Sequence, residues 1–204
     1  MPAETLRRFW TMLAHHQSGL LNAAEFARSL GVDGKTVATY LDLLVDLLLV
    51  RRLEPWHSNV GKRLVKSPRV YVRDSGMTHT LLGLANHEQI LGHPVAGASW
   101  EGFVIETLAA AAPYGSHLNF YRTAAGAEID ILITPPGARP WAIEIKRSLA
   151  PKVEKGILPC LRGNRPRTTP RRLSRFGNIS SKGRCRGNAA FRCWKAPARS
   201  CLNP

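Results

Sequence analysis

The sequence predicts an α+β protein with two small domains and a basic tail. Apolar residues at helical spacing dominate residues 1–80, and strand-like alternation dominates residues 118–146. The 204 residues include 29 Lys or Arg and 14 Asp or Glu, but the last 48 residues contain 12 of the basic residues and none of the acidic ones. We therefore expect domains at 1–80 and 81–156, followed by a disordered basic tail at 157–204.

Composition and pattern argue against a membrane or exported protein. No stretch approaches the ~18 uninterrupted apolar residues of a membrane span, because Asp42 and Asp46 break the most apolar run. The start of the chain lacks the basic-then-apolar pattern of a signal peptide. We expect a soluble, cytoplasmic protein with no membrane partner.

Three helices are predicted first. Residues 4–16 carry an apolar stripe at 3,4 spacing. Asn22 begins a capping box for a second helix, and Gly31 ends that helix. Asp33 caps a third helix, whose expected inner face consists of Val37, Tyr40, Leu41, Leu44, Leu47 and Leu48.

Two short helices around a glycine turn predict a helix-turn-helix, and the strand-like segments 50–53, 62–65 and 69–72 extend it to a winged helix. In a DNA-binding function the third helix would enter the major groove and the wing would lie near phosphates. The contacting residues would then be Lys35, Thr36 and Thr39 on the helix and Lys62, Arg63 and Lys66 in the wing.

The alternative is a module that only packs against a neighbouring domain, with its basic residues in solvent. Residues 1–156 support this alternative, since they carry a net charge of only +3. The segment Gly34-Lys35-Thr36 looks like the end of a phosphate-binding loop, but Ser29 stands where that motif needs glycine and a helix precedes it. We therefore predict no ATP site in this chain.

The second half predicts a helix followed by three strands. The helix runs from its cap at Ser99 to Ala112, where Pro113 ends it. Its expected inner residues are Trp100, Phe103, Val104, Thr107 and Leu108. The strands are predicted at 118–123, 128–133 and 141–146.

Candidate catalytic residues lie on the last two strands. Alternation puts Glu144 and Lys146 on one side of their strand. If the two strands pair as a hairpin, Asp130 and Glu144 converge, and two carboxylates repel unless a cation lies between them. Mg²⁺ is the usual cation for oxygen ligands, so Asp130 and Glu144 are the predicted metal ligands.

The same residues fit metal-assisted phosphodiester hydrolysis. Lys146 would neutralise charge that develops on a phosphate, and Glu101 would complete the outer shell of the metal. The alternative is that Glu144 and Lys146 are neighbours on a solvated sheet face, as alternating strands commonly show.

Over residues 5–156 the chain resembles the C-terminal region of a bacterial and archaeal family of AAA+ (P-loop) ATPases. The matching segments are 20–32, 36–44, 66–76, 97–104, 121–123, 126–130 and 142–146. The resemblance implies a winged helix followed by a domain of unknown function with a restriction-endonuclease-like, PD-(D/E)XK fold. It places Glu101, Asp130, Glu144 and Lys146 on the nuclease-like signature.

The family resemblance implies an accessory DNA- or partner-binding region that normally accompanies a P-loop ATPase module. We identify no such module within these 204 residues, so the resemblance assigns ATP binding to no residue here. The resemblance is to a family of ATPases of unknown role, and a Mg²⁺-dependent endonuclease is the alternative function.

The tail departs from the family pattern, in which a helix and a last strand should cover the sheet. Residues 157–204 have no helical or alternating period, and we interpret them first as the product of a shifted reading frame that begins near Gly156. A basic arm for nucleic acid is the second interpretation, and a zinc site at Cys185, Cys193 and Cys201 the third. Without the covering elements, we expect Ile129, Ile131, Ile143 and Ile145 to lose burial and catalysis to be weak or absent.

Overall fold

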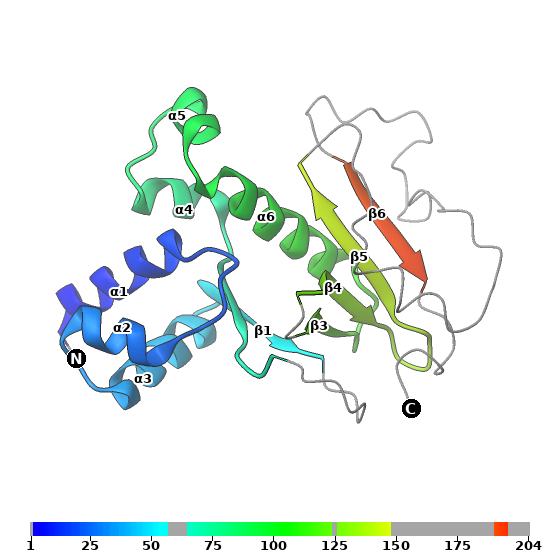
Figure 1. Cartoon of the computed structure of the whole chain (residues 1–204), viewed down its shortest axis with the longest axis horizontal. Helices are drawn as coiled ribbons and strands as arrows, with labels where there is room; N and C mark the ends of the chain where they lie inside the picture. The colour runs from blue at the N-terminus through cyan, green and yellow to red at the C-terminus, as the bar shows by residue number, and fades with distance from the viewer. Residues whose placement is uncertain (1, 57–64, 124–125, 148–189, 196–204) are drawn as a thin grey trace. The chain divides into compact units, whose positions relative to one another are not determined.

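The computed structural model describes residues 2–56, 65–123, 126–147 and 190–195, and shows a mixed α+β protein (Figure 1). The chain forms two compact units, one of residues 1–53 and 67–106 and one of residues 54–66 and 107–204. These units differ from the domains expected at 1–80 and 81–156, because residues 81–106 belong to the first unit. Within the described residues, no helix is long and apolar enough to cross a membrane.

Three helices form the core of the first unit: α1 (Ala3–His15), α2 (Ala23–Leu30) and α3 (Gly34–Asp46). Phe9 of α1 is fully buried and meets Phe26 of α2 edge-on, with ring centroids 5.5 Å apart. The ring of Tyr40 on α3 also lies near Phe9, with ring centroids 6.2 Å apart. The apolar stripes predicted for the three helices therefore meet in one core.

The predicted caps at both ends of α2 and at the start of α3 are confirmed. The side chain of Asn22 accepts a hydrogen bond from the Glu25 amide, and Gly31 adopts the left-handed conformation with φ of 69°. Asp33 accepts from the Thr36 amide at 2.6 Å, and this hydrogen bond lowers the pKa of the Asp33 carboxyl.

The predicted inner face of α3 is wrong at its end. Leu47 and Leu48 are 56% and 67% exposed. The reason is that the helix ends at Asp46 and Leu48 takes a φ of 59°, so the chain turns away before the apolar stripe reaches these positions.

Strands β1 (Val50–Pro55) and β2 (Arg69–Val72) pair antiparallel, with Val50 opposite Val72 and Leu53 opposite Arg69. The predicted strand at 62–65 lies almost entirely outside the described residues. Helices α4 (Ser75–Leu81) and α5 (His87–Gly92) follow β2.

The segment from Gln17 to Leu21 covers the side of β2 that does not face β1. The amide of Ser18 donates to the carbonyl of Val70, and the amide of Val70 donates to the carbonyl of Gly19. The side-chain amide of Gln17 completes this pairing by donating to the Val72 carbonyl at 3.1 Å and accepting from the Val72 amide at 2.8 Å.

Helix α6 (Val95–Ala111) begins four residues before the predicted cap at Ser99. Its buried residues include Val104, Ile105 and Leu108, whereas Phe103 is 49% exposed. The predicted inward position of Phe103 is therefore wrong, and so is that of Thr107, which is exposed. The helix is apolar on almost every side, so helical periodicity could not identify its buried face.

The predicted strands of the second unit are confirmed as β3 (His117–Arg122), β4 (Glu128–Thr134) and β5 (Trp141–Lys146). The end of β1 pairs parallel with β3, β3 pairs antiparallel with β4, and β4 pairs antiparallel with β5. The result is a mixed sheet that carries the candidate catalytic residues on β4 and β5.

The expectation of a fully disordered tail is wrong at residues 190–195. They form β6 (Ala190–Lys195), which pairs antiparallel with β5 over its whole length (Figure 1). An edge strand presents unpaired main-chain groups that can bind an extended segment without proline, whatever its side-chain period. The remainder of 157–204 lies outside the described residues.

The expected loss of burial in the sheet is also wrong. Ile131 and Ile143 are 0% exposed, and Ile129 and Ile145 are 6% and 7% exposed. An exposed sheet face therefore gives no reason to expect weak catalysis.

We predict opposite effects on stability for alanine at two glycines that flank the α2–α3 turn. At Gly31 an added methyl group contacts nothing within 4 Å, so Gly31→Ala should cost about 1–2 kcal/mol through the left-handed backbone alone. At Gly34 there is equal space without a positive φ, and Gly34→Ala should stabilise α3 by up to about 1 kcal/mol. Urea unfolding of both variants checks this, and equal effects would contradict it.

Candidate functional site

Three of the four predicted catalytic residues lie in the second unit, on neighbouring strands. The paired register of β4 and β5 ends at Ile131 opposite Ile143, so Asp130 and Glu144 are the next residues along each strand. Because side chains alternate along a strand, Asp130 and Glu144 lie on the face opposite to these isoleucines. The convergence of the Asp130 and Glu144 carboxylates remains a prediction.

The carboxylate of Asp130 is held by the backbone of the neighbouring strand. Its Oδ2 accepts a hydrogen bond of 2.6 Å from the amide of Ile145. This bond lies just beyond the Ile131–Ile143 pair, where the side chain takes the place of a main-chain acceptor. It fixes the Asp130 carboxylate against β5 at Ile145, the residue between Glu144 and Lys146.

Glu144 and Lys146 form an ion pair at the same position. Nζ of Lys146 lies 3.1 Å from Oε1 of Glu144. The side chain of Glu144 is only 8% exposed and that of Lys146 is 35% exposed. A buried carboxylate needs such a partner, so this pair has a structural role whatever its chemistry. The alternative of a fully solvated pair does not hold for Glu144.

Glu101 belongs to the first unit and binds partners there. Its Oε1 accepts from the hydroxyl of Tyr71 at 2.7 Å and from Nη1 of Arg69 at 3.2 Å. Burial, and then the charge of Glu101, raise the pKa of Tyr71, which keeps the phenol protonated as a donor. Glu101 therefore joins α6 to β2, and its place in a metal shell remains a prediction.

The donor set on β4 and β5 fits a hard cation. Among the described residues there is no group of three or more His, Cys, Asp or Glu that could hold a metal. Mg²⁺ is commonly bound through one or two carboxylates, with waters and substrate phosphates as its other ligands. Two carboxylates are enough protein ligands for Mg²⁺ but not for a zinc or calcium site, and the Mg²⁺ site at Asp130 and Glu144 remains a prediction.

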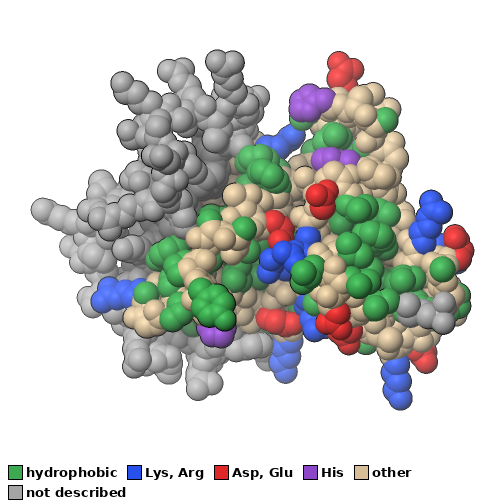
Figure 2. Space-filling view, turned by 180° about the vertical axis from the view of Figure 1, so that it is seen from behind, with side chains coloured by type: hydrophobic (Ala, Val, Ile, Leu, Met, Phe, Trp, Pro, Cys, Tyr) green, Lys and Arg blue, Asp and Glu red, His purple; other side chains and the backbone are tan. Residues whose placement is uncertain are grey.

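The predicted DNA-contacting residues are only partly described. Lys35 and Thr39 are exposed and Thr36 is partly exposed at the start of α3. The hydroxyl of Thr39 donates to the carbonyl of Lys35 at 3.0 Å. Lys62 and Arg63 lie outside the described residues. On the face shown in Figure 2, the described basic side chains are separated by acidic and apolar ones rather than gathered in one patch.

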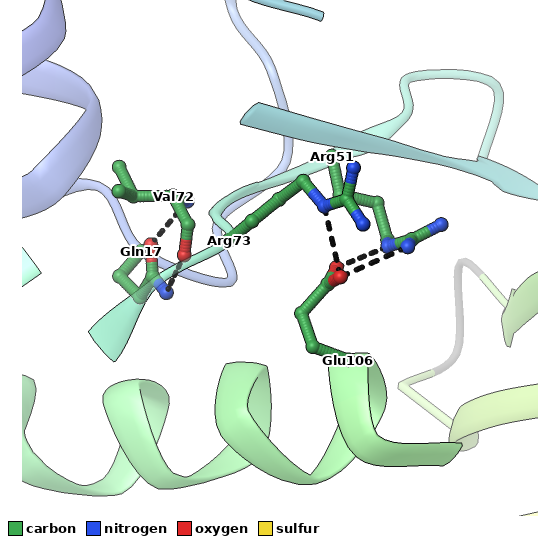
Figure 3. Close-up of polar contacts among 5 residues, drawn as sticks. All are labelled: Gln17, Arg51, Val72, Arg73 and Glu106. Carbon is green, nitrogen blue, oxygen red and sulfur yellow. Dashed lines mark hydrogen bonds and ion pairs between the residues drawn. The ribbon is translucent and has the colours of Figure 1, made fainter. Parts of the chain in front are cut away.

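Sequence reasoning missed a second group of charged residues in the first unit. Glu106 of α6 binds two arginines, Arg51 on β1 and Arg73 just after β2 (Figure 3). A signal for this group was present in the sequence, because Glu101 and Glu106 are the only charged residues of α6. Carboxylates in so apolar a helix need cations nearby, and the preceding strands supply arginines.

We predict that Asp130 stabilises the β4–β5 edge through its hydrogen bond to Ile145. Asp130→Ala removes the acceptor and should cost about 1–3 kcal/mol, while Asp130→Asn keeps an oxygen acceptor and should cost less. Urea unfolding of both variants measures the difference. Equal stability of the wild type and the alanine variant would contradict the structural role of this bond.

Two domain families match the chain. Residues 1–88 match DUF8612 and residues 96–177 match DUF4143, both described as domains of unknown function. The prediction of a domain of unknown function in the second half is confirmed, and DUF4143 typically occurs with AAA ATPase regions. The DUF4143 match extends 21 residues beyond Gly156, the position near which we placed the change of reading frame.

Two curated relatives also match. The chain is 46% identical over 162 residues to the uncharacterized proteins Rv2008c of Mycobacterium tuberculosis and Mb2031c of Mycobacterium bovis. The aligned region covers 79% of this chain but only 36% of each relative, so the chain spans about a third of their length. No solved structure matches the chain. The chain is therefore similar to one part of two longer mycobacterial proteins.

Proposed function

We propose that the chain is an accessory region of an AAA+ (P-loop) ATPase-family protein, which contacts DNA or a partner domain and hydrolyses no ATP itself. The observation that carries this proposal is the DUF4143 match, because such domains typically occur with AAA ATPase regions. The relatives support it, since about two thirds of their length lies outside the aligned region and leaves room for such a module.

The first unit supports the binding part of the proposal. Helices α1 to α3 followed by the antiparallel pair β1–β2 have the order of a winged helix. The start of α3, which enters the major groove in many such modules, carries the exposed Lys35 and Thr39.

We predict that Lys35→Ala weakens binding of duplex DNA about two- to tenfold and lowers the salt dependence by about one counterion, as expected for one phosphate contact. Arg8→Ala, which removes another exposed cation from α1, should leave both quantities unchanged. Both variants retain residues 157–204, so the basic tail contributes equally. Fluorescence anisotropy at several salt concentrations measures the effects. Identical curves for the two variants would exclude a DNA contact by Lys35.

A second function is supported by one specific observation, the juxtaposition of Asp130, Glu144 and Lys146 on β4 and β5. We propose Mg²⁺-dependent hydrolysis of phosphodiesters as this alternative. Asp130 and Glu144 would hold the ion, which when bound lowers the pKa of a water and stabilises charge on the phosphate. Lys146, already 3.1 Å from Glu144, would orient the scissile phosphate and offset its developing charge.

We predict that the protein nicks supercoiled plasmid with Mg²⁺, and that Glu144→Ala and Lys146→Ala each lower the rate about a hundredfold. Glu128→Ala, two residues before Asp130, is the matched control because Glu128 pairs with Arg122 instead. Circular dichroism of each variant separates loss of chemistry from loss of fold. Equal nicking by all the variants would remove the enzyme proposal and leave the accessory function intact.

A further inference from the structure

Two arginines from different strands share a single carboxylate in the first unit. Oε2 of Glu106 accepts from Nη2 of Arg51 at 3.0 Å and from Nε of Arg73 at 2.8 Å, and Oε1 accepts from Nε of Arg51. Two guanidinium groups therefore surround one carboxylate, and the group of three carries a net charge of +1. A positive charge of this kind in a partly buried place attracts an anion.

Glu106 fixes both arginines in position but binds only some of their guanidinium nitrogens. Glu106 takes Nε and Nη2 of Arg51 and Nε of Arg73, and among the described residues no protein atom binds Nη1 of Arg51 or either outer nitrogen of Arg73. In Figure 3 the nitrogen of Arg51 that does not bind Glu106 extends away from the carboxylate, and both guanidinium groups lie beside it. Guanidinium donors held in this way lose little conformational entropy when they bind a ligand.

Both arginine side chains are partly exposed to solvent. The side chains of Arg51 and Arg73 are 22% and 30% exposed, in contrast to that of Arg69, which is 5% exposed. Nearby acidic side chains bind elsewhere: Asp42 pairs with Arg52, and Asp74 caps α4 through the Met77 amide. The local excess of positive charge is therefore available to a ligand.

We propose that Arg51 and Arg73 form a binding site for a phosphate group, with Glu106 as the residue that positions both. Guanidinium groups match phosphate oxygens in pairs, and a tetrahedral anion can accept from two guanidiniums at once. The phosphate can belong to a nucleotide or to a DNA backbone, because both present the same oxygens. This site uses none of the residues assigned to DNA contact on α3 or to the candidate catalytic site, so it does not rest on either of those assignments.

The test is calorimetric titration of the full chain with sodium tripolyphosphate. The double variant R51K/R73K retains both charges and can keep ion pairs to Glu106, but it loses the forked donors. We expect its affinity to fall about tenfold or more, the effect of losing charge-assisted hydrogen bonds. The matched control R52K changes the neighbouring arginine of β1, which pairs with Asp42, and should bind like the wild type.

Equal affinity in all three proteins would overturn the proposal, since the ligand would then be bound by the basic tail or another surface. Thermal unfolding of each protein without ligand confirms that the variants fold. If R51K/R73K is unstable, the single variant R73K, which alters only one bond to Glu106, replaces it.

Competition then identifies the source of the phosphate. ATP without magnesium and a short duplex DNA are each added to the tripolyphosphate complex. Displacement by ATP alone assigns the site to nucleotides, and displacement by DNA at equal phosphate concentration assigns it to the DNA backbone. Failure of both to displace the probe would overturn the proposal. Unchanged DNA binding by Lys35→Ala would not affect this result, so the two proposals fail separately.

Discussion

A carboxylate that leaves water must find a cation or hydrogen-bond donors, and this constraint shapes both units of the protein. Glu101 and Glu106 lie on an otherwise apolar helix, and they bind arginines of the β1–β2 region. In the second unit, the buried Glu144 binds Lys146 two residues along its own strand. Each glutamate fixes the side chains around it, and these fixed side chains include the ones that the proposals assign to ligand contact.

In the functions proposed above, the same side chains would have both structural and chemical roles. Lys146 offsets the charge of Glu144, and it is also the amine that a phosphodiester would meet next to the two carboxylates. Arg69 and Arg51 both bind glutamates of α6, but only Arg51 keeps an appreciable exposed fraction. Both arginines are paired, so it is the exposed fraction of the side chain that decides whether such a cation can also contact a ligand.

Local patterns allowed much of the fold to be predicted. Asn22, Gly31 and Asp33 mark helix ends through short-range hydrogen bonds and backbone preference, and strand alternation placed Asp130 and Glu144 on one face. Other features depend on tertiary contacts that no local pattern contains. The pairing of β6 uses main-chain groups, and the meeting of Arg51, Arg73 and Glu106 joins residues 33 and 55 positions apart. The exposure of Leu48 follows from its own left-handed backbone, which no glycine in the sequence announces.

The segment from Gln17 to Leu21 has a consequence for how this protein behaves in a crowded solution. A sheet border with open amides and carbonyls recruits strands from other molecules and starts aggregation. Here the border of β2 is closed by a loop of the same chain, with the Gln17 carboxamide as a substitute for a peptide group at Val72. Gly102 makes room for that carboxamide, because a methyl group there would lie 2.8 Å from its nitrogen. One glutamine and one glycine thus help to keep neighbouring molecules from adding themselves to the sheet.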